Sequence, residues 1–232
     1  MATTLNQLWT NASSIIGLDS ETSGTDDQAL VTYYANEAVR QVLMETNCTV
    51  TSATVTPGAN ADYTLTTSML ALRDLYFTSG GLRYMLEPTS MDEILWKRRA
   101  TGASGPVRNY ALAGNTLLMF YPTPAAADEL TMYYVPVPTE MSASAHDASS
   151  STYGGIPAAI FDAVENYVLW KCADADDDTT SDMGDRYRGA YEMSIRNARK
   201  YLRGKSGYRL SPARLRARRR TAPNPSTSPA VY

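Results

Sequence analysis

Few side chains in this chain are of the kind that carries out acid–base or nucleophilic chemistry. The one histidine, His146, lies in a segment rich in Ser and Ala between residues 139 and 155. Catalysis needs titratable groups that converge in a fixed geometry, and a triad would have to recruit this imidazole from a flexible segment. We therefore expect His146 to be a solvated loop residue, and we expect no catalytic residue and no enzymatic activity.

Three aspartates have the spacing of a calcium-binding loop. Asp174, Asp176 and Asp178 match its positions 1, 3 and 5. Position 6 is Thr179, where such a loop needs glycine, and position 12 is Asp185 in place of glutamate. Acidic residues before a helix are also favoured by the helix dipole. We expect a solvated turn between two helices and no metal site, with a weak cation site at an interface as the alternative.

The sequence also lacks the usual signatures of cofactor binding and membrane insertion. It contains neither glycine-rich phosphate-binding motif, and its two cysteines, Cys48 and Cys172, are not in a C-x-x-C pair. We expect two buried free thiols and no cofactor. No run of about 18 apolar residues occurs, and residues 1–10 do not resemble a secretory signal, so we expect no membrane contact.

Charge is distributed very unevenly along the chain. Residues 193–232 contain no Asp or Glu and hold 11 of the 21 Lys and Arg residues, whereas residues 1–192 carry 10 basic against 24 acidic side chains. This uneven charge distribution predicts a basic tail that binds an acidic partner. The tail could dock on a protein and fold on binding, contact DNA phosphates, or simply aid solubility. The predicted docking residues are Arg209, Arg214, Arg216, Arg218, Arg219 and Arg220.

Tyrosine is the dominant aromatic residue, with 16 copies against three of phenylalanine. Tyrosine is amphipathic and common in protein interfaces, although half-burial in strands explains most of these side chains. Four tyrosines in predicted strands are candidates for a surface that faces a neighbouring subunit: Tyr110, Tyr121, Tyr133 and Tyr134.

The hydrophobic periodicity changes twice along the chain. Apolar residues recur every three or four positions over about 26–45, which predicts a helix. From 49 to 135 they alternate, which predicts strands, and helical spacing returns after Pro157 in two stretches. Ser90 and Glu93 form a capping box that predicts a short helix between strands. The predicted turns are Pro57-Gly58, Gly80-Gly81 and Gly114-Asn115.

These patterns predict an α+β fold, with helical segments at both ends, an inserted antiparallel β-rich subdomain and a disordered basic C-terminal arm. The expected units are N-terminal helices at 1–47, a β-rich subdomain at 48–138 with a short helix near 90–99, a linker at 139–155, a C-terminal helix pair at 156–205 and the basic extended arm at 206–232.

Several short motifs resemble the head-to-tail adaptor proteins of tailed bacteriophages. Residues 110–124, which end in Tyr-Pro-Thr-Pro, and residues 130–134 resemble the strand pairs of these adaptor proteins. After a polar stretch, Ile156-Pro157 resembles the start of the helix that follows in such proteins. The similarity spans roughly residues 26–203. Further matching residues are Tyr33, Tyr34, Ala38 and Val39 in the early helix, and Phe161, Ala163, Tyr167, Tyr187, Tyr191 and Arg199 in the late ones.

The resemblance implies a structural virion protein that forms a ring, usually of twelve copies, beneath the portal protein. Such a ring extends the DNA channel and provides the docking platform for a tail, nozzle or tail-terminator protein, and genomic DNA passes through it without sequence-specific contact. The expected location is the virion neck, with host cytoplasm during assembly. The alternative function, from the tail charge, is a protein that binds or anchors DNA.

Overall fold

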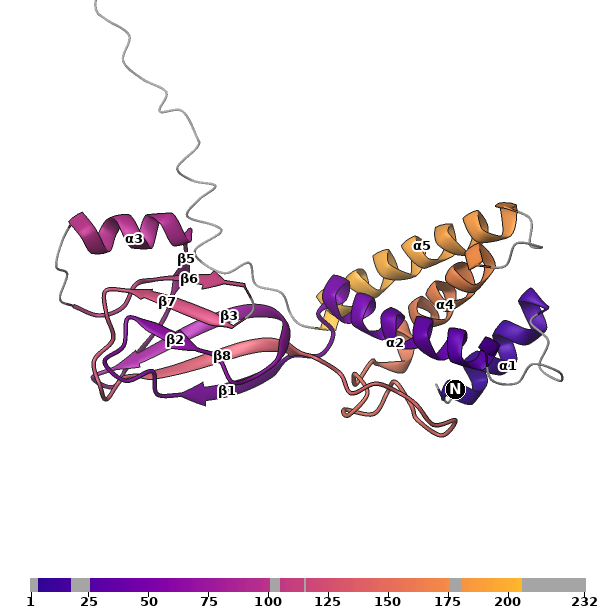
Figure 1. Ribbon diagram of the computed structural model, residues 1–232, viewed down its shortest axis with the longest axis horizontal. Coiled ribbons are helices and arrows are strands. Elements are labelled where there is room, and N and C mark those ends of the chain that lie inside the picture. The colour runs from indigo at the N-terminus through magenta and orange to yellow at the C-terminus, as the bar shows by residue number, and fades with distance from the viewer. Residues whose placement is uncertain (1–3, 18–25, 101–104, 115, 176–180, 206–232) are drawn as a thin grey trace, which may run out of the picture.

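The computed structural model describes residues 4–17, 26–100, 105–114, 116–175 and 181–205 of the 232-residue chain. Its elements form two lobes, a helical lobe and a β lobe, which lie side by side along the long axis (Figure 1). Both ends of the chain contribute helices to the helical lobe, and the residues between them build the β lobe. The predicted α+β class, with a strand-rich unit inserted between helical segments, is confirmed.

The helical lobe is held by one continuous hydrophobic core. Its helices are α1 (Leu5–Ile16), α2 (Asp26–Thr46), α4 (Asp162–Ala175) and α5 (Ser181–Lys205). One face of α2 buries Val31, Ala38 and Val42, and α2 packs against α4, which buries Val164 and Val168. Helices from the two ends of the chain therefore stabilise one another, and neither end can bury its apolar stripe alone.

The β lobe is a pair of four-stranded sheets. The first has the order β1-β8-β3-β4 and the second β2-β7-β6-β5. All neighbours are antiparallel except the short β5–β6 pair, which is parallel. The strands are β1 (Thr51–Val55), β2 (Asp62–Thr64), β3 (Met69–Ser79), β4 (Leu82–Met85), β5 (Glu87–Pro88), β6 (Asn109–Ala113), β7 (Leu117–Tyr121) and β8 (Glu129–Pro136).

The two sheets pack face to face over a second core. Phe77 of the first sheet and Phe120 of the second are both fully buried, with ring centroids 6.4 Å apart. Helix α3 (Met91–Ala100) covers the other face of the second sheet through Ile94, which packs on Ala111 and Met119. The predicted short helix and both glycine hairpins are present.

Residues 139–155 connect the two lobes and also pack on the helical one. Met141 and Ala148 are buried in the helical core, and the Asn36 side chain hydrogen bonds to both the N–H (2.7 Å) and the carbonyl (3.0 Å) of Met141. Pro157 does not begin the next α-helix as predicted, because a 3₁₀ turn, Ala158–Ile160, comes before α4. Within the described ranges, no helix is long and apolar enough to cross a bilayer.

Candidate functional site

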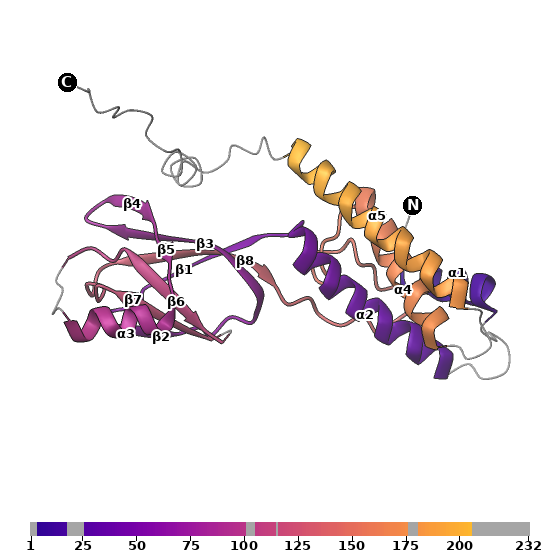
Figure 2. The same ribbon diagram turned by 90° about the horizontal axis from the view of Figure 1, so that it is seen from above.

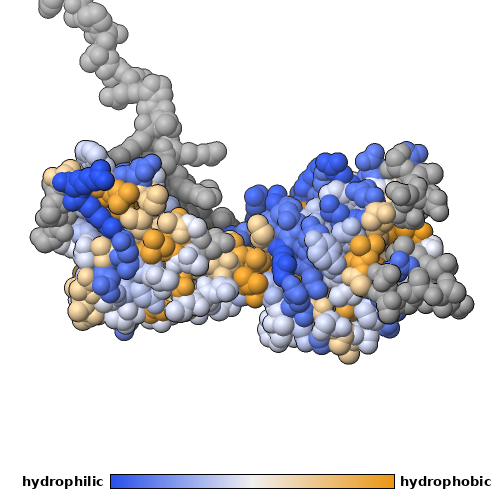
Figure 3. All heavy atoms as spheres, viewed as in Figure 1, coloured by the Kyte–Doolittle hydropathy of each residue, from blue (hydrophilic) through white to orange (hydrophobic). Residues whose placement is uncertain are grey.

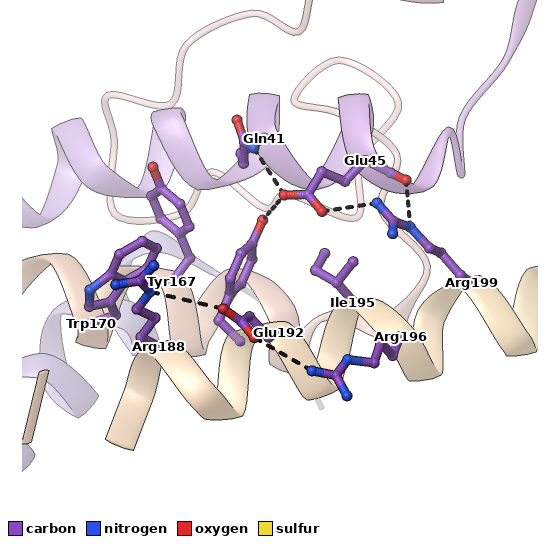
Figure 4. A pocket seen from close by; sticks show the side chains of 10 residues that line it. Gln41, Glu45, Tyr167, Trp170, Arg188, Glu192, Ile195, Arg196 and Arg199 are labelled. Carbon is purple, nitrogen blue, oxygen red and sulfur yellow. Dashed lines mark hydrogen bonds and ion pairs between the residues drawn. The ribbon is translucent and has the colours of Figure 1, made fainter. Parts of the chain in front are cut away.

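A groove of about 410 Å³ runs between α2, α4 and α5 (Figure 4). We call it the Glu45 groove, after the carboxylate at its end. It is lined by Gln41, Glu45, Tyr167, Trp170, Arg188, Tyr191, Glu192, Ile195, Arg196 and Arg199.

Glu45 sits in the last turn of α2 and ties that helix to α5. Its Oε1 accepts hydrogen bonds from the Tyr191 hydroxyl at 2.8 Å and from Nε2 of Gln41 at 2.9 Å. Arg199 donates to Oε2 and to the Glu45 backbone carbonyl, both at 3.0 Å. The guanidinium thereby satisfies a carbonyl that the end of α2 leaves without a helical partner.

Burial and a neighbouring carboxylate hold the groove tyrosines in their neutral form. Burial first, and then the hydrogen bond to Glu45, raises the pKa of Tyr191. Burial and the 2.7 Å hydrogen bond to Glu37 raise the pKa of Tyr167 in the same way. Both hydroxyls are therefore hydrogen-bond donors that join helices, and neither is placed to act as a base.

The outer rim of the groove is a row of alternating charges on α5. Glu192 lies between Arg188, at 3.9 Å, and Arg196, at 3.5 Å (Figure 4). The Arg188 guanidinium lies 5.6 Å from the Trp170 ring centroid, and the Lys171 ammonium lies 4.5 Å from the same centroid. Exposed pairs of this kind contribute little to stability, so the rim is a charged surface that a partner can meet.

The β lobe carries a second cluster, on the outer face of its first sheet. The Arg83 guanidinium lies 4.6 Å from the Tyr76 ring centroid and donates to the Tyr133 hydroxyl at 3.1 Å. The two rings meet edge to face, with centroids 5.7 Å apart. Tyrosine and arginine that hold each other in place are typical of residues that dominate binding energy in interfaces.

The four tyrosines predicted to face a neighbouring subunit have different environments. Tyr110 and Tyr134 are 9% and 7% exposed and belong to the β-lobe core. Tyr121 and Tyr133 are half-buried and keep part of each ring at the surface. The interface role stays a prediction. Of the four, Tyr121 and Tyr133 are the ones exposed enough to contact a neighbouring subunit.

His146 is not the solvated loop residue that we predicted. It is half-buried and stacks on Tyr153, with ring centroids 4.3 Å apart. Its Nδ1 accepts the backbone N–H groups of Ser142 (3.0 Å) and Ala143 (3.3 Å). These contacts fix the imidazole within the connecting segment, so its role here is to order that segment.

The remaining predicted sites fall partly outside the described residues. Cys172 is buried and Cys48 is half-buried, and both are free thiols. Asp174 lies at the end of α4, but Asp176 and Asp178 lie outside the described residues, as do all six arginines of the predicted docking arm. Among the residues that the structure does describe, no three His, Cys, Asp or Glu side chains are grouped as a metal site.

Sequence reasoning did not find the Glu45 groove or the Arg83 cluster. Glu45 and Arg199 are 154 positions apart, and Arg83 and Tyr133 are 50 apart, so no local spacing links them. The strand register of the folded sheet brings them together, since Tyr133 pairs with Asp74 of β3 and Arg83 with Thr78 of the same strand.

The sequence was also compared with known proteins. It matches the family model described as SU10 adaptor protein over residues 3–223, and no curated protein matches it. The match covers nearly the whole chain and implies contacts with portal and tail components, self-association and a location at the virion neck. Such structural adaptor families are typically non-enzymatic. The chain belongs to the SU10 adaptor family and is a structural head-to-tail adaptor of a bacteriophage.

Proposed function

We propose that this adaptor assembles as a ring, of twelve copies by analogy, beneath the portal protein. The ring extends the DNA channel, provides the docking platform for a tail, nozzle or tail-terminator protein, and performs no catalysis. The observation that carries the proposal is the family match over residues 3–223. The two-lobed shape supports it, because lobes with separate cores can meet different partners without sharing a surface (Figure 1).

The charge distribution fits a channel through which DNA slides. Residues 1–192 carry 10 basic and 24 acidic side chains, a net charge of −14. A wall of this sign repels phosphate and gives DNA no place to bind tightly. Figure 3 shows that hydrophilic surface covers much of the helical lobe, while a hydrophobic patch lies where the two lobes meet. Val50 and Val137, next to the chain crossings between the lobes, are 45% and 41% exposed.

The basic arm supplies the contact with the portal or with a neighbouring subunit. Helix α5 ends at Lys205 and 27 residues follow it, which could span at most roughly 90 Å when fully extended. The arm's six predicted docking arginines complement acidic protein surface. Tyr121 and Tyr133 are the half-buried aromatic residues that we assign to partner contact.

The alternative is a DNA-anchoring protein that acts through the same arm. The observation in its favour is that residues 193–232 hold 11 basic and no acidic side chains. Phosphate binding of this kind depends steeply on salt and requires no shape complementarity. The two functions therefore differ in what the arm recognises.

Arm variants separate the two functions. Portal binding and duplex DNA binding are measured at several salt concentrations for the full chain and for a chain that ends at residue 205. A third chain has Gln in place of the six docking arginines, and its matched control has Lys. The adaptor function predicts that affinity for the portal falls on truncation and on the Gln changes. It also predicts that electron microscopy shows a ring when the full-length chain is mixed with portal particles. Unchanged portal affinity together with lost DNA affinity would favour the anchoring function.

A further inference from the structure

The first sheet of the β lobe has two open edges. Its order is β1-β8-β3-β4, and in the described part of the chain no strand lies beyond β1 or beyond β4. β1 runs along the lower margin of the β lobe in Figure 1, and β4 lies at the margin of the lobe in Figure 2. An open edge presents a row of backbone N–H and C=O groups that can pair with another strand.

These edges are short, but they carry few of the side chains that usually prevent such pairing. β1 has the sequence Thr-Ser-Ala-Thr-Val, with no charged residue and no proline, and the one charge of β4 is Arg83. Two apolar side chains of β4, Leu82 and Met85, are 74% and 42% exposed. Soluble proteins normally place lysine, proline or a bulge at such edges, so an uncharged β1 and an apolar, exposed β4 in one sheet indicate a surface that is covered on assembly.

The backbone directions at the two edges can be followed through the ladders. The Leu86 N–H donates to the Leu75 carbonyl at 2.9 Å, so the alternation of an antiparallel ladder turns the backbone groups of Arg83 and Met85 away from β3. The registers of β3 with β8 and of β8 with β1 show which residues point their backbone groups toward each neighbouring strand. It turns the backbone groups of Ser52 and Thr54 away from β8.

From this arrangement we infer that β1 of one copy pairs with β4 of the next, so that neighbouring subunits share a continuous antiparallel sheet. The inference rests on the proposed ring and identifies one of its subunit contacts. Because the sheet has four antiparallel strands, β1 and β4 run in opposite directions, and a second copy of β1 lies antiparallel to β4 without any change of fold.

Matching the two faces of the strands gives the register. Arg83 lies opposite Thr54 of the next copy, and Met85 lies opposite its Ser52, on the outer face. On the inner face Leu82 lies opposite Val55, which covers its exposed side chain. A slip by one residue would turn Leu82 to the polar face, which the side-chain alternation excludes. A slip by two residues keeps the faces but leaves at least one residue of β4 without a partner in β1, so the full overlap of the two strands selects this register.

A second copy fits these edges better than another partner does. A foreign strand would cover one edge and leave the other open, whereas copies that join head to tail cover both and can close into a ring. The contact involves only four residues of β4, and strands this short bury far less surface than the roughly 1,200 Å² of a stable interface. The pairing is therefore weak in a free pair and becomes stable when the portal holds many copies together.

Disulfide cross-linking tests the register. The double variant Thr54→Cys/Arg83→Cys is assembled on portal particles and oxidised, and each single variant serves as a control that keeps the native Cys48 and Cys172. Within one chain the two positions are three strand spacings apart, about 14 Å, which no disulfide can bridge. We expect a ladder of covalent multimers from the double variant and none above background from either single variant.

A proline variant tests the same contact without new thiols. Thr54→Pro removes an N–H that points away from β8, so the sheet within the chain keeps its ladder, and Thr54→Ala is the matched control. We expect roughly tenfold fewer rings on portal particles for the proline variant than for the alanine one. Any one of three results would overturn the inference. These are a wild-type ring yield for Thr54→Pro, the absence of a ladder from the double cysteine variant, and a cross-link to portal or tail protein. Wild-type particles with no ring would instead refute the proposed function, and the ring contact with it.

Discussion

The contacts of Glu45 predict that replacing this one carboxylate loosens the helical lobe. In Glu45→Ala the Tyr191 hydroxyl, on a residue that is only 6% exposed, loses its acceptor, which costs about 1–3 kcal/mol. The lost pair with Arg199, whose side chain is 47% exposed, adds about 0–1 kcal/mol, and the lost Gln41 contact adds about 0.3 kcal/mol. We expect the free energy of unfolding to fall by about 2–4 kcal/mol.

Conservative variants show which contact is responsible. Glu45→Gln keeps an acceptor for Tyr191, so we expect a loss of about 1 kcal/mol, much of it from the Arg199 pair. Tyr191→Phe removes the donor, and the double variant Glu45→Ala/Tyr191→Phe should then be less destabilised than the sum of its single variants by about 1 kcal/mol.

Urea unfolding followed by far-UV circular dichroism measures these differences, because α1, α2, α4 and α5 dominate the helical signal. The two lobes have separate cores, so the transition of the helical lobe must be fitted by itself if two transitions occur. A loss below about 0.5 kcal/mol for Glu45→Ala, or strict additivity in the double variant, would show that solvent satisfies Tyr191 and that the groove does not hold the helices together.

Three further changes have distinct expected results. Gly154→Ala should lower the free energy of unfolding by about 2–5 kcal/mol, because Gly154 has φ +132° and an added Cβ would lie 2.8 Å from Cγ1 of Val39. The control Gly189→Ala, whose added Cβ meets nothing within 4 Å, should be neutral or slightly stabilising, and thermal melts compare the two. Burial raises the pKa of Cys172 to about 12 from its ordinary 9.0, so its thiol contributes stability that is complete below pH 9 and is lost as pH rises toward 12. The free energy of unfolding, measured across that range, should therefore fall less steeply with pH for Cys172→Ala than for the wild-type chain. The same slope for both proteins would contradict this. Arg98→Met should destabilise the β lobe by about 1–2 kcal/mol, because its guanidinium donates to two backbone carbonyls and a carboxylate beneath α3; hydrogen exchange of α3 should rise, and unchanged protection there would refute the role.

Much of the fold follows from local patterns in the sequence. The Ser90 hydroxyl accepts the N–H of Glu93 at 3.2 Å, as the capping box predicts, and α3 begins at the next residue, Met91. Gly80 and Gly81 both have positive φ and join β3 to β4, as the hairpin prediction requires. In each case the residues that specify the structure lie within a few positions of the element that they form.

What the sequence did not predict depends on contacts between distant residues. The sequence groups Tyr110, Tyr121, Tyr133 and Tyr134 as one candidate surface because they lie in predicted strands, but successive side chains of a strand such as β8 point to opposite faces. Tyr134 therefore enters the core while Tyr133 meets Arg83 outside. Likewise, residues 139–155 have the composition of a linker, and only the tertiary contacts of Met141 and Ala148 anchor them. Polar composition predicts exposure on average and does not detect one or two apolar anchors.

The place where the β lobe is inserted explains how one chain can serve two partners. The chain enters the lobe through β1 and leaves it through β8, and these strands pair directly, with Thr51 opposite Tyr134. The two crossings are thus neighbours, so α2 and α4 can pack together as if the intervening residues were absent. Besides these crossings, Leu70 and Ala71 of β3 pack against the helical core, so the contact between the lobes is confined to one small region. A contact made by the β lobe can therefore shift its orientation while the helices keep their packing, which suits an adaptor that contacts two components.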